Sequence, residues 1–233
     1  MQLPLFYEPQ IAKDLSTFNL SENSSKHCVQ VLRMKIGDRL HITDGLGNLL
    51  TVRIISAHKK NCSVKMLDRK FFPSDRKNLC IAITPTKNSA RMEWLLEKLT
   101  EIGVTKIILM QCEHSERLNI RYERLHHILI SAMLQSQQLH LPQLSELTSF
   151  EQVISKENYA EKYIAHCADD AEKAILPTNK TEQSKIILIG PEGDFSPHEI
   201  ALSKAHKYIP VSLGETRLRT ETAGLVAAVL LLH

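Results

Sequence analysis

Two short segments near the end of the chain gather the side chains best suited to chemistry. Residues 190–195 contain the sequence Gly-Pro-Glu-Gly, and residues 213–219 contain a glycine and two arginines. The groups of interest are Gly190, Glu192, Gly193, Gly214, Arg217, Arg219 and, just beyond the second segment, Glu221. Arginines beside free backbone N–H groups at a helix start can stabilise negative charge on a reacting group. The alternative is a pair of surface turns whose charges are simply solvated, with Glu221 favouring a helix dipole.

Each segment follows a predicted strand and precedes a predicted helix. The apolar run from Lys185 to Ile189 leads into the first, and Ser196, Pro197 and Glu199 then give a capping serine, a first-turn proline and a capping box. A strand predicted over 208–213 leads into the second, where Thr220 can cap a helix. Open α/β sheets bind ligands at the carboxyl ends of their strands, and glycines let the backbone approach a ligand closely. Both segments are therefore expected to line one binding site.

The chain beyond residue 78 alternates between predicted strands and helices. Strands are expected at 79–84, 106–110, 162–165 and 185–189, and helices at 88–102, 122–136, 196–206 and 220–232. Continuous apolar strands between helices are typical of a largely parallel sheet covered on both faces. The predicted fold class is therefore α/β. Residues 114–117 follow the strand at 106–110, so they are expected near the same edge of the sheet.

The first 72 residues read as a separate, basic and β-rich region. Strands at 39–43, 49–57 and 61–67, a turn at 44–48 and a helix at 24–34 fit a small β-barrel that ends near Pro73. This region has 11 Lys and Arg against 6 Asp and Glu, whereas residues 73–233 have 18 against 20. The imbalance favours contact with a polyanion, for which Arg33, Lys35 and Arg39 are candidate phosphate contacts. Alternatively, Arg33 and Asp38 serve the packing of the barrel itself.

Composition argues against several classes of protein. The longest apolar run, Ala223 to Leu232, is too short to span a bilayer, and no signal-peptide pattern is visible. The five cysteines are scattered, so we expect reduced thiols in a cytoplasmic protein. No spacing of histidines or cysteines is typical of a metal site, so no metal is expected. The glycine motifs of Rossmann and P-loop proteins are absent.

Several motifs closely resemble the RsmE family, the 16S rRNA uridine-N3 methyltransferases of the SPOUT superfamily. The matching segments are Val31-Leu-Arg-Met-Lys-Ile-Gly-Asp38, Asp44-Gly-Leu-Gly47, Lys98-Leu-Thr-Glu-Ile-Gly-Val104, Ser115-Glu-Arg117, Gly190-Pro-Glu-Gly193 with Phe195, Ser196 and Glu199, and Leu213-Gly214 with Arg217-Leu-Arg-Thr-Glu-Thr-Ala223. They cover nearly the whole chain in the expected order. Their combination is highly specific, although Gly-Pro-Glu-Gly alone is not.

The resemblance implies a PUA-like barrel at residues 1–72 and a SPOUT methyltransferase domain at 73–233 that ends in a trefoil knot. It also implies S-adenosylmethionine (SAM) as methyl donor, 16S rRNA in the 30S subunit as substrate, and a homodimer. The implied cofactor-binding residues are Gly190, Glu192, Gly193, Leu213, Gly214, Leu218 and Thr220. The implied catalytic residues are Arg217, Arg219 and Glu221, and the implied RNA contacts are Arg33, Lys35, Arg39 and Arg117. The arginines would stabilise charge on the uracil, and Glu221 or a water would take the N3 proton.

The sequence departs from the family pattern at two places. Asp194 stands where the family often has a second glycine, and residues 134–138 lack the glutamate and arginine that often occur there. The second departure leaves open a catalytically silent RNA-binding homologue. A SPOUT enzyme that acts on another RNA base or on tRNA is a further alternative, because function depends on the site rather than on the fold. A transferase for small molecules would leave the basic barrel unexplained.

Overall fold

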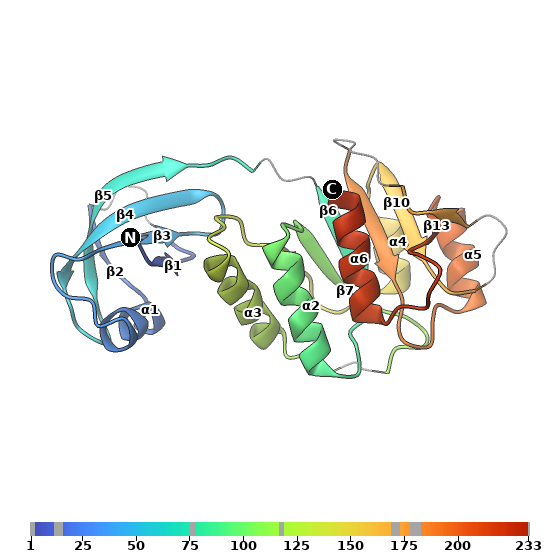
Figure 1. The fold of residues 1–233 in the computed structure, drawn as a ribbon, viewed down its shortest axis with the longest axis horizontal. Coiled ribbons are helices and arrows are strands. Elements are labelled where there is room, and N and C mark those ends of the chain that lie inside the picture. Colours follow the sequence, from blue (N-terminus) through green and yellow to red (C-terminus); the bar gives the residue numbers. More distant parts are fainter. Residues whose placement is uncertain are drawn as a thin grey trace. The chain divides into compact units, whose positions relative to one another are not determined.

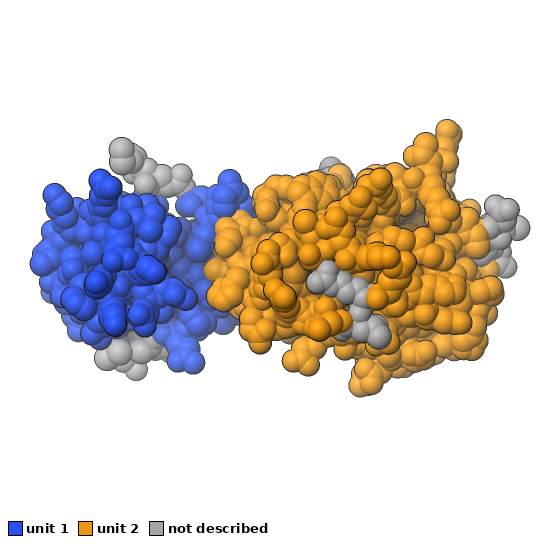
Figure 2. Space-filling view, turned by 90° about the horizontal axis from the view of Figure 1, so that it is seen from below, with its two compact units in different colours: residues 1–75, 133–141 blue, residues 76–132, 142–233 orange. Residues whose placement is uncertain are grey.

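A computed structural model of the protein describes residues 3–11, 16–74, 78–116, 119–168, 173–177 and 183–232. The chain divides into two compact units, drawn in different colours in Figure 2. The first unit contains residues 1–75 and 133–141, and the second contains residues 76–132 and 142–233. None of the helices in the described part of the chain is long and apolar enough to cross a membrane.

The first unit is a curled five-stranded sheet with one short helical segment, which confirms the small barrel predicted from the sequence (Figure 1). Its strands are β1 (Leu5–Tyr7), β2 (Thr17–Asn19), β3 (Arg39–Thr43), β4 (Asn48–Ser56) and β5 (Ser63–Phe71), in the order β1-β3-β4-β5-β2. A helix α1 (Glu22–Lys26) continues into a π-helical turn, η1 (His27–Val31). The strands β1 and β2 were not predicted, because three residues are too few to show an alternating pattern.

The predicted glycine turn between β3 and β4 is held by the side chain of Asp44. Its Oδ1 accepts hydrogen bonds from Leu46 N at 2.8 Å and from Asn48 N at 3.2 Å. Residues 133–141 return to this turn, where Gly47 N donates to Leu139 O and Leu141 N donates to Gly45 O. The departure at residues 134–138 therefore falls within a stretch that belongs mainly to the first unit.

The second unit is an eight-stranded sheet in which every described strand pair is parallel. The strand order is β11-β13-β10-β12-β6-β7-β8, with β9 also pairing with β7. The strands are β6 (Leu79–Ile83), β7 (Lys106–Gln111), β8 (Gln143–Leu144), β9 (Thr148–Ser149), β10 (Glu161–Ala165), β11 (Ala174–Ile175), β12 (Lys185–Ile189) and β13 (Ile209–Ser212). The five longer strands lie where the sequence predicted them, whereas the two-residue strands were missed.

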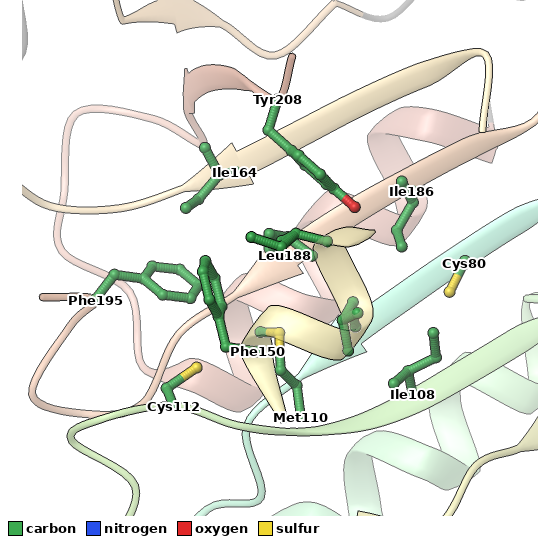
Figure 3. Close-up of a cluster of buried hydrophobic side chains, with 13 residues drawn as sticks. Cys80, Ile108, Met110, Cys112, Phe150, Ile164, Ile186, Leu188, Phe195 and Tyr208 are labelled. Carbon is green, nitrogen blue, oxygen red and sulfur yellow. The ribbon is translucent and has the colours of Figure 1, made fainter. Parts of the chain in front are cut away.

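Helices cover both faces of this sheet, as predicted. They are α2 (Ser89–Glu101), α3 (Tyr122–Gln135), α4 (Phe150–Lys156), α5 (Pro197–Ala205) and α6 (Thr220–Leu232). Gly224 of α6 lies against Ile83 of β6 and Leu95 of α2, with no space for a Cβ atom. On the opposite face, Phe150 of α4 joins Ile108 and Leu188 in a buried cluster (Figure 3). The helix α4 was not predicted from the sequence, because its seven residues are too few to show a helical periodicity of apolar positions.

Candidate functional site

Two neighbouring cavities lie at the carboxyl ends of β10, β12 and β13. The larger has a volume of about 410 Å³ and is lined by Ala165, His166, Cys167, Lys173, Val211, Ser212, Leu213, Gly214, Glu215, Thr216, Arg217, Leu218 and Ala223. The smaller, of about 260 Å³, is lined by Cys167, Pro191, Glu192, Asp194, Arg217, Leu218, Arg219 and Thr220. The two cavities share Cys167, Arg217 and Leu218. The two segments selected from the sequence therefore meet at one site.

The loop after β12 is anchored by the ring of Phe195. A Cβ atom on Gly190 would lie 3.0 Å from two carbons of that ring. The ring is buried, with its centroid 5.8 Å from that of Phe150 (Figure 3). The missing side chain of Gly190 therefore makes room for the Phe195 ring.

The predicted capping box at the start of α5 is present and extends further than expected. Glu199 Oε2 accepts from Ser196 N at 2.8 Å, and Glu199 N donates to Ser196 Oγ at 3.2 Å. The second carboxylate oxygen, Oε1, accepts from Glu113 N at 2.9 Å. Because Glu199 is only 4% exposed, these charge-assisted bonds connect the start of α5 firmly to the loop after β7.

Asp194 lies at the meeting point of three loops. Its φ of +65° is in the left-handed region that glycine adopts freely and aspartate tolerates. The carboxylate accepts from Phe195 N at 2.9 Å and from Cys167 N at 2.8 Å. His114 Nδ1 donates to the carbonyl oxygen of Asp194 at 3.0 Å, so the segment after β7 does reach this site, as the sequence suggested.

The loop after β13 is exposed and makes few internal contacts. Gly214 has a φ of +140°, and a Cβ atom there would meet nothing within 4 Å. Arg217 donates to the backbone oxygen of Glu192 at 3.4 Å, and Arg219 is exposed at the wall of the smaller cavity. Thr220 begins α6 and its hydroxyl donates to Gly190 O at 3.2 Å. Its side chain therefore joins the two loops, a role that differs from the predicted helix cap.

Two of the predicted carboxylates have partners that are distant in sequence. Glu221 is 8% exposed and faces Arg91 Nε at 3.5 Å, and it is not among the residues that line either cavity. Glu192 lines the smaller cavity and accepts from Lys87 N at 3.3 Å. Gly193 lies outside both walls, against the side chain of His114.

Ala165, His166 and Cys167 line the larger cavity but were not selected from the sequence. Ala165 ends β10, and His166 and Cys167 directly follow it, so the rule that ligands bind beyond the carboxyl ends of parallel strands would have found them. The described residues contain no group of three histidine, cysteine or acidic side chains arranged to hold a metal ion.

The predicted RNA contacts of the first unit lie on its surface. Arg33, Lys35 and Arg39 are all exposed, and Arg33 has a φ of +54°. Asp38 accepts from Lys35 N at 2.7 Å, so this carboxylate holds the turn. The carboxylate of Asp38, although exposed, therefore serves the local structure of the barrel, as the alternative expected of it. Arg117 lies outside the described residues.

Two family models and several known proteins match the chain. The family described as "RNA methyltransferase domain" matches residues 73–232, and the family described as "RNA methyltransferase PUA domain" matches residues 20–67. The ribosomal RNA small subunit methyltransferase E of Rickettsia conorii is 27% identical over 215 residues, which cover 91% of this chain and 88% of the relative.

Two solved structures resemble almost the entire chain. A "probable rRNA-methyltransferase" from Porphyromonas gingivalis is 42% identical with a TM-score of 0.89, covering 99% of this chain and 98% of that one. The ribosomal RNA small subunit methyltransferase E of Neisseria gonorrhoeae, solved with bound S-adenosyl methionine, is 25% identical with a TM-score of 0.84, covering 98% and 96%. Because the family model for the RNA methyltransferase domain matches residues 73–232, most of the chain, the chain belongs to the RNA methyltransferase family.

Proposed function

We propose that this protein transfers a methyl group from SAM to N3 of a uridine in 16S rRNA, with the 30S subunit as substrate. The observation that carries the proposal is the pair of cavities that share Arg217 and Leu218 as a common wall. A methyl donor bound in the larger cavity and an acceptor base bound in the smaller cavity would lie next to each other at these shared residues. Such alignment supplies much of the rate enhancement of group transfer.

The larger cavity suits a cofactor of the size and polarity of SAM. Its volume of about 410 Å³ falls within the usual range for small-molecule sites. Leu213 and Leu218 give it apolar surface, and Gly214 leaves open space beside the backbone. These residues would hold the cofactor together with Glu192 and Thr220 from the adjoining wall, while Gly190 and Gly193 would shape the loop beneath. When bound, SAM supplies an electrophilic methyl group on a sulfonium.

The chain's own residues would promote the reaction by electrostatic stabilisation. The N3 nitrogen of uracil carries a proton at neutral pH, and its removal places negative charge on O2 and O4. Arg217 and Arg219 border the smaller cavity and would stabilise that charge. Glu221 is paired with Arg91 and lines neither cavity. We therefore propose that a water molecule accepts the N3 proton, and that Glu221 positions the first turn of α6.

We further propose that the N-terminal domain, residues 1–72, holds the rRNA through Arg33, Lys35 and Arg39, with Arg117 as an additional contact from the second domain, residues 73–233. Exposed cations that neutralise phosphates release counterions, so affinity should fall steeply with salt. Replacing all three first-unit cations with glutamine should reduce the slope of log affinity against log salt by about 3. An unchanged slope in a filter-binding titration would contradict this assignment.

Homodimer formation, a trefoil knot at the end of the chain and a cytoplasmic location complete the proposal. Helix α6 is apolar around most of its surface, yet Val229 remains 40% exposed and Trp94 of the adjoining α2 remains 44% exposed. A second copy that covers these side chains would bury apolar area. Sedimentation at micromolar concentration should give twice the chain mass of 26.5 kDa.

Methyl transfer from labelled SAM tests the proposed activity directly. The acceptors should be 30S subunits lacking the modification, naked 16S rRNA and tRNA, followed by nucleoside analysis. We expect 3-methyluridine from the 30S subunit. Label in tRNA or on another base would keep the methyltransferase class but reject the substrate. The absence of transfer to any RNA would favour a silent RNA-binding homologue.

A further inference from the structure

The carboxylate of Asp194 joins two loops that otherwise leave the sheet separately. Strands β10 and β12 are neighbours, with Ala165 paired to Ile189 at their carboxyl ends. Beyond these residues the two segments are no longer held to each other by strand pairing. The hydrogen bond from Cys167 N to Asp194 Oδ2, at 2.8 Å, reconnects them across 27 positions of sequence.

The backbone at Asp194 points the carboxylate toward this bond. Asp194 N donates to Pro191 O at 3.0 Å, closing a turn whose last residue has a φ of +65°. The second carboxylate oxygen accepts from Phe195 N, and Phe195 is itself fixed in the core. A glycine could adopt the same φ, but it would supply no acceptor for Cys167 N.

Cys167 borders both cavities, so its placement affects both binding sites. We infer that Asp194 is a positioning residue that fixes the segment 165–167 as a wall of the cofactor cavity and thereby sets the affinity for SAM. The inference rests on the proposed function for the identity of the ligand. The contact between Asp194 and Cys167 is independent of that function.

The variant Asp194→Gly tests the inference, because glycine accepts the left-handed backbone without strain. SAM affinity should fall about tenfold, a factor that corresponds to about 1.4 kcal/mol and matches the loss of a hydrogen bond to a charged acceptor. The loss should be larger in SAM affinity than in kcat at saturating SAM, because the contact positions a wall of the cofactor cavity. Asp194→Asn keeps one acceptor oxygen, so its SAM affinity should lie between those of the wild type and Asp194→Gly. Asp68→Asn, an exposed carboxylate in β5 that accepts from Arg69 N, serves as the matched control.

Amide hydrogen exchange at Cys167 separates failure of this inference from failure of the proposed function. Without any ligand, exchange at this amide should be faster in Asp194→Gly than in the wild type. Equal exchange in the two proteins would show that the contact does not hold the segment, whatever the ligand. Faster exchange with unchanged SAM affinity, or a loss confined to kcat, would also overturn the inference. A wild-type chain that binds no SAM would contradict the proposed function, while the exchange rates would still decide the contact.

Discussion

The loop after β12 and the loop after β13 meet at the same site but are held in different ways. In residues 190–196, Phe195 fills the core, and Asp194 bonds to the loop after β10. In residues 213–219, the side chains from Glu215 to Arg217 are exposed, and Arg217 donates a long hydrogen bond, at 3.4 Å, to the backbone oxygen of Glu192. A rigid loop can preorganise a binding wall, whereas an exposed loop can adjust when ligands arrive. We therefore propose that the first loop, residues 190–196, forms a rigid wall of the binding site. The second loop, residues 213–219, would stabilise the negative charge that develops on the uracil.

The largest expected effect is on the chemical step and belongs to the second loop. Arg219→Ala should lower methyl transfer at least ~100-fold, the scale of losing one transition-state donor. SAM affinity should change little, because Arg219 borders only the smaller cavity. Initial rates at saturating SAM measure the effect, and Arg121→Ala, an exposed arginine ahead of α3, is the control. Turnover near the wild-type level would remove Arg219 from the mechanism.

The largest expected effect on stability concerns Glu199 of α5, whose carboxylate holds the end of the first loop at Ser196. Glu199→Ala leaves the N–H groups of Ser196 and Glu113 without their acceptor, which should lower the free energy of unfolding by about 2–3 kcal/mol. The matched change in the second loop is Glu215→Ala, which removes an exposed carboxylate and should stay within about 0.5 kcal/mol. Urea titrations of both variants measure the difference. Equal losses would mean that the two loops are held alike.

A smaller effect is expected where a side chain is added to the first loop. The new methyl group in Gly190→Ala would lie 3.0 Å from the Phe195 ring, and overpacking of this kind costs roughly 1–3 kcal/mol. Combining it with Phe195→Leu should recover part of the loss in a double-mutant cycle. Thermal unfolding of the four proteins provides the test, and strictly additive losses would show that the two positions are not in contact.

The smallest expected effect concerns the hydrogen bond that connects the start of α6 to the loop after β12. Thr220→Val removes the hydroxyl that donates to Gly190 O at 3.2 Å and should cost about 1 kcal/mol of unfolding free energy. Thr220→Ser retains the hydroxyl and should lie closer to the wild type. A lower denaturant midpoint for Thr220→Ser than for Thr220→Val would contradict this contact.

Local signals in the sequence predicted most elements of the second unit. The capping serine, proline and glutamate at residues 196–199 act within four positions, and the structure contains that capping box. Contacts between distant residues could not be predicted in the same way. Glu113 N meets Glu199 across 86 positions, and Cys167 N meets Asp194 across 27. Such pairs depend on strand order, which periodicity does not specify. The return of residues 133–141 to the first unit was missed for the same reason.

The cavity beside the second loop is proposed to hold SAM, and the cysteines of the chain allow a direct test. Burial raises the pKa of Cys28 and Cys80 to about 12, and it also raises the pKa values of Cys62 and Cys112. These four thiols should resist alkylation near neutral pH, whereas Cys167 is exposed at both cavities. We would measure maleimide labelling of Cys167 during a SAM titration. We expect labelling to slow in parallel with SAM binding. Saturable SAM binding with an unchanged labelling rate would contradict this location of the cofactor.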